Sequence, residues 1–184
     1  MGGGGKRFLD IGAYTGDVML SYKELGWEVE GVELSKTAVA FAKQHRGIDN
    51  ILSCEIEDAP YPNNHFDYIN FWHVIEHLRD PIIVLRKIFD WLKPGGQLKL
   101  GTPNPITPMG NIQTLVTGVF DLGPDHTFGY PKATMKRIFT EIGFEIVAHD
   151  FYPGSRKNKS LQRKIIDRLG LYNTMQRVIA NKPK

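Results

Sequence analysis

The stretch Phe8-Leu9-Asp10-Ile11-Gly12-Ala13-Tyr14-Thr15-Gly16 decides the fold. Its first half is an apolar run typical of a buried strand, and its two glycines mark a bend into a helix. A second predicted strand ends at Glu33, 21 residues after Gly12. In such a strand–turn–helix–strand unit, backbone N–H groups at the bend approach a ligand closely, and an acid after the second strand accepts hydrogen bonds from both ribose hydroxyls. The pattern predicts a pocket for a nucleoside-containing cofactor.

Short apolar runs alternate with helical patterns along the rest of the chain, which is typical of parallel strand–helix–strand units. We expect strands over 6–12, 27–33, 50–55, 66–72, 97–102, 144–151 and 175–180. We expect helices over 16–25, 35–44, 81–92 and 131–142. Neither a repeat nor a domain boundary is visible. The chain is therefore predicted to form a single α/β domain over 1–184, built on a doubly wound sheet.

Local signals mark the ends of several helices. Ser35 and Asp80 are typical helix N-caps, and Pro81 suits the first helical position. Gly26 is expected to close the first helix. The helix after Asp80 should end at a turn over 93–96, where a proline is followed by two glycines. The buried face of that helix is predicted to consist of Ile82, Leu85, Phe89 and Leu92.

Composition bounds the class of protein. The 184 residues are 41% apolar and carry a net charge of +3, which is ordinary for a globular protein. No run approaches the ~18 apolar residues of a membrane span, and the N-terminus lacks the apolar core of a signal peptide. The single cysteine, Cys54, is expected to be a small buried residue in a strand, and it is compatible with a reducing cytoplasm. Residues 1–5 are predicted to be a flexible leader.

Two further segments carry functional hypotheses. Residues 103–130 are rich in proline and glycine, and we expect them to form a substrate-facing insert with one helix over 112–117. Residues 161–169 are predicted to form a basic amphipathic helix. An anionic partner such as a phosphorylated substrate, a membrane surface or RNA would fit its charge, as would a solvated face. The mild net charge of the whole chain does not predict a nucleic-acid partner.

A series of motifs occurs in an order that identifies a family. The run Asp10-Ile11-Gly12-Ala13-Tyr14-Thr15-Gly16 resembles the first motif, D-[IV]-G-x-G-x-G, of class I S-adenosylmethionine-dependent methyltransferases. The segments 57–62 and 66–69 resemble the family's E-D-L-P-F-P and F-D-L-V, and 73–78 resembles its H-V-L-E-H-L. Residues 92–98, 102–104 and 131–147 resemble L-x-P-G-G-x-L, T-P-N and the segment ending in G-F-E-[IV]-V. The resemblance implies a Rossmann-like, mostly parallel seven-stranded sheet with helices on both faces and an antiparallel last strand.

The resemblance also implies roles for individual residues. Those around the methionine part of S-adenosylmethionine, or of its product S-adenosylhomocysteine, would be Asp10, Gly12, Ala13, Tyr14 and Gly16. Glu33 would hold the ribose, and Leu34 would pack near the adenine. Glu55 and the backbone N–H of Ile56 would read the adenine edge, while Phe71 and Trp72 would place a backbone carbonyl near the cofactor's amino group. Tyr14 replaces the family's middle glycine, so its side chain has to point away from the cofactor.

Histidines near the expected pocket are candidates for an acceptor-activating base, because the pKa of a histidine lies near working pH. His73 follows the fourth strand, and His126 lies in the predicted insert. The run from His73 to His77 also fits H-x-x-E-H, a zinc pattern that would place both histidines on one helical face. A catalytic zinc needs three protein ligands and no third is evident, so we expect no metal here. His77 is expected to pack locally, and Glu76 to cap or brace the segment.

Three functions remain open from the sequence. The first is methyl transfer from S-adenosylmethionine to an acceptor, preferably an oxygen of a small molecule, glycan or lipid precursor. The family's nucleobase-amine members carry [DNS]-P-P-[YF] after the fourth strand, and residues 70–73 replace it here, so DNA-base methylation is disfavoured. The second is a non-catalytic cofactor-binding or regulatory protein, which Tyr14 and the short segment before the first strand favour. The third is an enzyme acting on RNA or at a membrane through its basic C-terminal helix.

Overall fold

A computed structural model describes residues 5–106, 129–152 and 175–184. Its strands are β1 (Arg7–Ile11), β2 (Glu28–Val32), β3 (Ile51–Leu52), β4 (Phe66–Trp72), β5 (Leu92–Pro103), β6 (Glu145–Tyr152) and β7 (Met175–Asn181). Its helices are α1 (Asp17–Glu24), α2 (Lys36–Arg46), α3 (Pro81–Trp91) and α5 (Lys132–Ile142). Two short 3₁₀ turns, η1 (Ile56–Asp58) and η2 (Ile75–His77), lie after β3 and β4.

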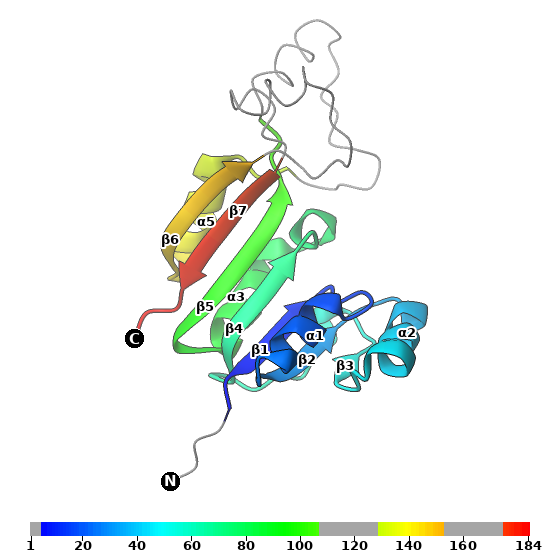
Figure 1. The fold of residues 1–184 in the computed structure, drawn as a ribbon. Helices are drawn as coiled ribbons and strands as arrows, with labels where there is room; N and C mark the ends of the chain where they lie inside the picture. The colour runs from blue at the N-terminus through cyan, green and yellow to red at the C-terminus, as the bar shows by residue number, and fades with distance from the viewer. Residues whose placement is uncertain (1–4, 107–128, 153–174) are drawn as a thin grey trace, which may run out of the picture.

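The strands that the structure describes form one sheet in the order β3-β2-β1-β4-β5-β7-β6 (Figure 1). All neighbouring pairs are parallel except those of β7, which runs antiparallel to both β5 and β6. The predicted doubly wound, mostly parallel seven-stranded sheet with an antiparallel last strand is confirmed. Because β1 lies between β2 and β4, the chain winds in opposite directions on its two sides. The carboxyl ends of β1 and β4 therefore flank a crevice where ligands bind in such sheets.

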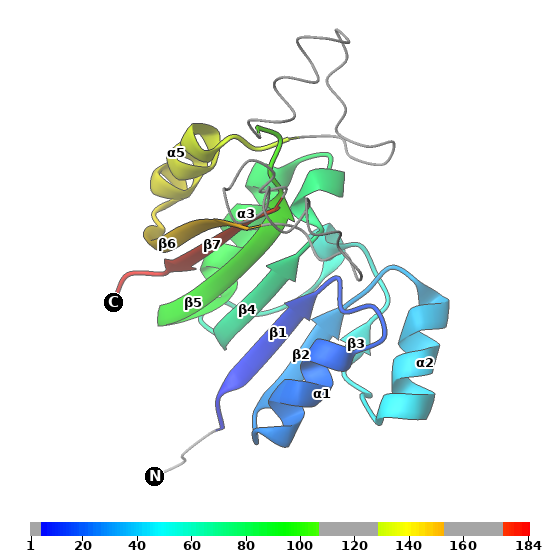
Figure 2. The ribbon, with the colours of Figure 1, turned by 45° about the horizontal axis from the view of Figure 1, so that its top comes forward.

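Helices cover both faces of the sheet, as Figure 2 shows. On one face, Met19 of α1 and Ala42 of α2 pack with Phe8 of β1 in a smaller apolar cluster. On the other, Leu85 of α3 and Phe139 of α5 belong to a larger cluster with the central strands. Residues of β1 and β4 are thus buried from both sides, which explains their nearly continuous apolar sequence. This burial fixes the positions of the strand ends that bear the candidate site.

The predicted helix caps are present. The Ser35 hydroxyl accepts a hydrogen bond from the backbone N–H of Ala38 at 3.2 Å. The Asp80 carboxylate accepts one from the N–H of Ile83, also at 3.2 Å, with proline in the first turn of α3. Gly26 follows α1 with a φ of 82°, in the left-handed region that favours glycine. Short polar side chains and glycine therefore set these helix ends as the sequence indicates.

The predicted turn over 93–96 is wrong, because β5 already begins at Leu92. Leu92 pairs with Phe66 of β4, and the register then shifts before the next pair. Backbone bonds between Lys182 and the glycines at 95 and 96 continue the sheet through this segment. The proline and glycines therefore form an irregular strand start. Leu92 consequently does not belong to the helix, and Ile82 is 42% exposed, so the buried face of α3 consists of Val84, Leu85, Ile88 and Trp91.

The third strand is shorter than predicted. Only Ile51 and Leu52 pair with β2, and residues 53–55 leave the sheet edge. Cys54 is therefore not a buried strand residue: it is half-buried in the connection to η1. Burial raises the pKa of its thiol, and the nearby Asp58 carboxylate raises it further.

Several predicted features lie outside the described residues. These are most of the leader over 1–5, the helices over 112–117 and 161–169, and His126. The insert over 103–130 is described only at its ends, where Pro103 belongs to β5 and Tyr130 is buried. The single-domain organisation stays a prediction. Within the described ranges, no helix is both long and apolar enough to cross a membrane.

Candidate functional site: a cavity at the carboxyl ends of the strands

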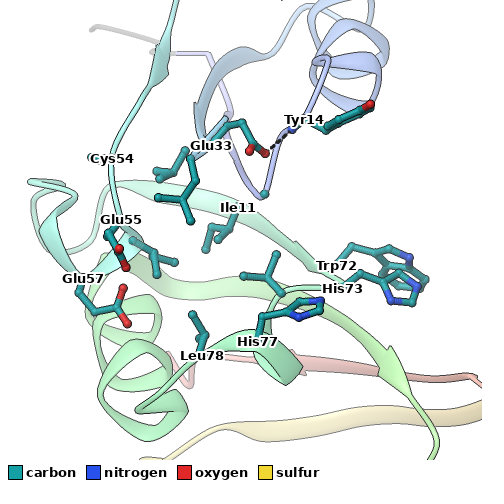
Figure 3. Close-up of a pocket in the computed structure, with 15 residues that line it drawn as sticks. Ile11, Tyr14, Glu33, Cys54, Glu55, Glu57, Trp72, His73, His77 and Leu78 are labelled. Carbon is teal, nitrogen blue, oxygen red and sulfur yellow. Dashed lines mark hydrogen bonds between the residues drawn. The ribbon is translucent and has the colours of Figure 1, made fainter. Parts of the chain in front are cut away.

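A cavity of about 440 Å³ lies at the carboxyl ends of β1, β2 and β4 (Figure 3). It extends along the crevice that the strand order creates. The structure brings eight of the predicted site residues to its wall: Gly12, Tyr14, Glu33, Leu34, Glu55, Ile56, Trp72 and His73. These residues come from four separate segments between Gly12 and His73, and the fold brings them together in a single site.

The loop after β1 is held by the backbone of the neighbouring strand. The N–H groups of Gly12 and Ala13 both donate to the carbonyl of Val32, at 2.9 and 3.1 Å. Gly12 has a φ of 75°, and a Cβ there would lie 2.5 Å from a methyl carbon of Val74. Only glycine fits this position, for both conformational and steric reasons. The Val74 side chain therefore occupies the space that a side chain at residue 12 would need.

Tyr14 also adopts the left-handed conformation, with a φ of 46°. Its backbone N–H faces Glu33 and donates to Oε2 at 2.8 Å. Its ring is 66% exposed and points away from Ile11 and Glu33 in Figure 3. The loop thus uses the tyrosine backbone where the family pattern has glycine and directs the bulky ring outward. Tyr14 nevertheless lines both cavities of the site, so its direction relative to a cofactor stays a prediction.

Glu33 is fixed in place by the backbone at both carboxylate oxygens. Oε2 accepts from the N–H of Tyr14, and Oε1 accepts from the N–H of Ser35, each at 2.8 Å. A carboxylate offers about four acceptor positions, so each oxygen keeps capacity for one more donor. The side chain lines the cavity while held rigidly. This arrangement suits a ligand with two adjacent hydroxyl groups.

A second cavity of about 320 Å³ adjoins the first and shares Gly12, Tyr14 and Trp72 with it. Predicted residues Asp10 and Ala13 line this second cavity. Asp10 is 3% exposed and accepts from the Asn70 amide at 2.7 Å. Burial raises its pKa to about 6, against the lowering effects of Asn70 and Lys99. The carboxyl group is therefore poised to change its charge near neutral pH.

Two predicted residues line neither cavity. Gly16, with a φ of 76°, is the N-cap of α1. Phe71 is fully buried in the core, so any ligand contact by Phe71 has to come from its backbone carbonyl. Trp72, which follows Phe71 at the end of β4, lines both cavities. Its ring packs against Gly101, where a Cβ would lie 2.3 Å from a ring carbon.

The end of the cavity nearest η1 offers both apolar and polar surface. Leu34 is 63% exposed there, although it is a large apolar side chain. The Glu57 side chain also lines the cavity, and its Oε2 atom is buried and has no hydrogen-bond partner. The exposed leucine suits contact with the face of a flat heterocycle.

The segment after β4 does not form the helix that the zinc pattern requires. His73 has a φ of 56°, and only Ile75–His77 form a 3₁₀ turn. His73 and His77 both line the cavity, but Glu76 is fully buried behind them. No group of three metal-ligating side chains occurs in the ranges that the structure describes. Glu76 braces the segment, as expected, by bonding to His73 and Thr102.

Several cavity residues were not singled out as ligand-contacting from the sequence. Ile11 and Val32 end their strands at the cavity, and Val74 and Leu78 follow β4 there. Their apolar side chains look like ordinary core residues in a sequence, so only the strand-end positions could have indicated them. Lys99 of β5 lines the second cavity, and its ammonium lies 4.8 Å from the centre of the Trp72 ring. A charged residue between Leu98 and Leu100, which are both buried, was the available signal.

The fold and this strand-end cavity define a nucleotide-cofactor-binding protein of the doubly wound class. A family described as "Methyltransferase domain" matches residues 2–149, which is most of the chain. The chain therefore belongs to the methyltransferase-domain family, within the class I methyltransferases that use S-adenosylmethionine.

Individual relatives agree with this assignment. A phosphoethanolamine N-methyltransferase of Arabidopsis thaliana is 32% identical over 156 residues, covering 79% of this chain and 30% of that protein. A mitochondrial ubiquinone biosynthesis O-methyltransferase of Schizosaccharomyces pombe is 32% identical over 105 residues, covering 53% of this chain and 38% of that protein. A crystal structure of a methyltransferase from Archaeoglobus fulgidus superposes with a TM-score of 0.71 at 22% identity, covering 97% of this chain and 87% of that one. The matched region thus spans well under half the length of the Arabidopsis and Schizosaccharomyces enzymes.

Proposed function

We propose that this chain binds S-adenosylmethionine across the two cavities and transfers its methyl group to an oxygen of a small molecule, glycan or lipid precursor. The observation that carries the proposal is the double anchoring of Glu33 by the Tyr14 and Ser35 backbone. It leaves acceptor capacity on both oxygens toward the cavity. Two vicinal ribose hydroxyls are the donors that such a carboxylate takes in this class of fold.

The other residues fit the remaining parts of the cofactor. Leu34 suits the face of the adenine ring, because it is exposed and lines the first cavity. Asp10 lies in the second cavity, beyond the glycine loop, where it suits the amino acid part. Gly12 lines both cavities with its backbone alone, so a ligand can approach the main chain there. We therefore assign the holding of the cofactor to Asp10, Gly12, Ala13, Tyr14, Gly16, Glu33, Leu34, Glu55, Ile56, Phe71 and Trp72.

When bound, S-adenosylmethionine supplies an electrophilic methyl group, whose bond to sulfur breaks with its electron pair going to sulfur. The protein's part is to align the acceptor and to remove its proton. His73 is the described residue placed for the second task, because it follows the end of β4 and lines the cavity beside Trp72. Its side chain is 45% exposed, so an acceptor can reach the ring. His126 lies outside the described residues and stays a prediction.

The preference for an oxygen acceptor rests on two observations. The motif of nucleobase-amine enzymes is replaced by Asn70-Phe71-Trp72-His73, and the Asn70 amide is engaged by Asp10, to which it donates. A histidine base suits a hydroxyl acceptor, which loses its proton as the bond to carbon forms. The single cysteine supports a cytoplasmic location.

A labelled-transfer assay tests this proposal. The purified chain is incubated with methyl-labelled S-adenosylmethionine and a panel of hydroxylated small molecules, sugars and isoprenoid phenols, beside matched amines. We expect label in at least one hydroxyl compound and little in the matched amine. Label confined to amines would overturn the choice of oxygen. Binding of S-adenosylhomocysteine without transfer to any member of the panel would favour the non-catalytic alternative.

A further inference from the structure

His73 is held in an unusual backbone conformation at the mouth of the cavity. Its φ of 56° lies in the left-handed region, which is costly for a non-glycine residue. Its backbone N–H donates to the carbonyl of Gly101 on β5 at 2.9 Å, which continues the β4–β5 ladder by one residue. Strained residues that the surrounding structure holds in place cluster at functional sites. The strained backbone therefore makes His73 a candidate functional residue.

The side chain gains a chain of two hydrogen bonds that leads into the protein core. His73 Nδ1 lies 3.0 Å from Glu76 Oε1. The other oxygen of Glu76, Oε2, accepts from the Thr102 hydroxyl at 3.0 Å. Glu76 has no exposed surface, and Thr102 is 1% exposed, whereas the His73 side chain is 45% exposed. These two hydrogen bonds therefore connect the cavity with a fully buried carboxylate.

The charge of Glu76 decides which nitrogen of His73 carries the proton. Burial raises the pKa of the Glu76 carboxyl, but hydrogen bonds from His73, its own backbone N–H and Thr102 outweigh this, and the net pKa is below its ordinary value. Glu76 is therefore ionised at neutral pH and only accepts hydrogen bonds. Nδ1 of His73 must then be the donor. The lone pair of a neutral His73 consequently resides on Nε2, at the other side of the ring.

We propose that Glu76 and Thr102 are positioning residues that set the tautomer and orientation of His73, so that its Nε2 accepts the proton of a hydroxyl acceptor. This inference rests on the proposed function. The proton moves from the acceptor oxygen to Nε2 as that oxygen bonds to the methyl carbon, and it later passes from Nε2 to water. The buried carboxylate stabilises the positive charge that the ring carries in between. The pair of His73 and Glu76, called the dyad below, thereby fits an acceptor that loses a proton on methylation.

Other titratable groups surround the pair and belong in any account of its pH dependence. Tyr14, Glu33, Cys54, Glu55, Glu57 and His77 line the same cavity as His73. On the buried side, the Tyr130 hydroxyl donates to the Ile75 carbonyl at 3.3 Å. Burial, and to a smaller extent the Glu76 charge, raises the pKa of that phenol to about 12. Among the contacts described above, the His73 ring bonds to Glu76 and to none of these other groups.

Nuclear magnetic resonance tests the dyad without any turnover. Histidine-selective ¹⁵N labelling gives ring signals for the six histidines, and His73→Gln identifies the signal of His73. We expect the Nδ1–H tautomer in the wild type and a change in the ring shifts in Glu76→Gln. An Nε2–H tautomer in the wild type would overturn the proposal, whether or not transfer activity is found.

Kinetics with an accepted hydroxyl substrate test the role in the reaction. Glu76→Gln should lower kcat about 100-fold, within the range for general acid–base catalysis, with the affinity for S-adenosylhomocysteine unchanged. The pH profile of kcat should change in this variant, because the substitution removes the buried charge that contacts the His73 ring.

A matched pair of variants at Thr102 guards against misfolding of the Glu76 variant. Thr102→Val removes the hydroxyl at nearly constant shape and should lower kcat, whereas Thr102→Ser keeps the hydroxyl and should retain it. An unchanged kcat and pH profile in both Glu76→Gln and Thr102→Val would overturn the proposal. An equal loss of cofactor affinity in Glu76→Gln would show a merely structural role and would overturn it as well. A wild type with the Nδ1–H tautomer but without transfer would instead refute the proposed function alone.

Discussion

Replacing Asp10 by asparagine should stabilise the protein, and the gain should depend on pH. Asp10 is 3% exposed on β1, and the Asn70 amide donates to its Oδ1 at 2.7 Å. Burial raises its pKa from 3.8 to about 6, with Asn70 and Lys99 opposing the rise and Glu33 adding to it. Asparagine keeps an acceptor for Asn70 but carries no charge. The substitution therefore removes the cost of ionising a buried carboxyl.

The magnitude follows from the two pKa values. Between about pH 4 and pH 6 the unfolded chain has already lost a proton that the folded protein still holds. Stability contributed by this group is therefore fully present below about pH 4 and falls as pH rises through 6. Above that window the difference in pKa corresponds to about 3 kcal/mol. We expect Asp10→Asn to be more stable than the wild type by up to that amount at pH 7.5, and equal to it at pH 4.

Urea denaturation followed by circular dichroism at pH 4, 5, 6 and 7.5 measures the difference. Asp90→Asn serves as the control, because Asp90 is an exposed aspartate on α3 and its substitution should change stability little at any pH. A difference between Asp10→Asn and the wild type that stays constant across this range would refute the reasoning. A variant that is less stable at pH 7.5 would show that the charged form of Asp10 is favoured in the fold.

Three further substitutions test the packing around the site by thermal denaturation and cofactor binding. Gly12→Ala should cost about 2 kcal/mol or more, because it combines a left-handed conformation with a clash at Val74, and it should weaken S-adenosylhomocysteine binding. Gly101→Ala should cost about 1–3 kcal/mol by displacing the Trp72 ring, and unchanged stability would show that the ring moves freely. Ser35→Ala should cost about 1 kcal/mol through loss of the α2 cap, without a comparable change at Ser21→Ala on the exposed surface of α1.

Much of the fold was predictable because its signals are local. The apolar run of β4 and the caps at Ser35 and Asp80 each act through neighbouring residues, and the structure shows all of them. The start of β5 was not predictable in this way. Pro94 and the two glycines are turn signals, but pairing with β4 and with the backbone near Lys182 overrides them. Those partners are distant in sequence, and their effect is invisible in a local pattern.

The site, like the fold, was predictable in part. The position of Glu33 after β2 predicted its place in the cavity, since parallel strands end at one sheet edge. The conformation of His73 could not be predicted from the spacing of 73 to 77, because its backbone N–H bonds to Gly101 of β5, a residue distant in sequence. The outward direction of the Tyr14 ring was likewise undecided by its position in the glycine motif. Its direction depends on the backbone N–H that bonds to Glu33.

Calorimetric titration with S-adenosylhomocysteine tests the central claim most directly. The wild type should bind the ligand, and Glu33→Gln should bind it about 10- to 100-fold more weakly, since the variant loses charge-assisted hydrogen bonds to the ribose. Glu24→Gln, at an exposed position at the end of α1, should bind like the wild type. Absence of binding by the wild type at millimolar ligand, or equal affinities of the wild type and Glu33→Gln, would contradict the assignment of this cavity to the cofactor.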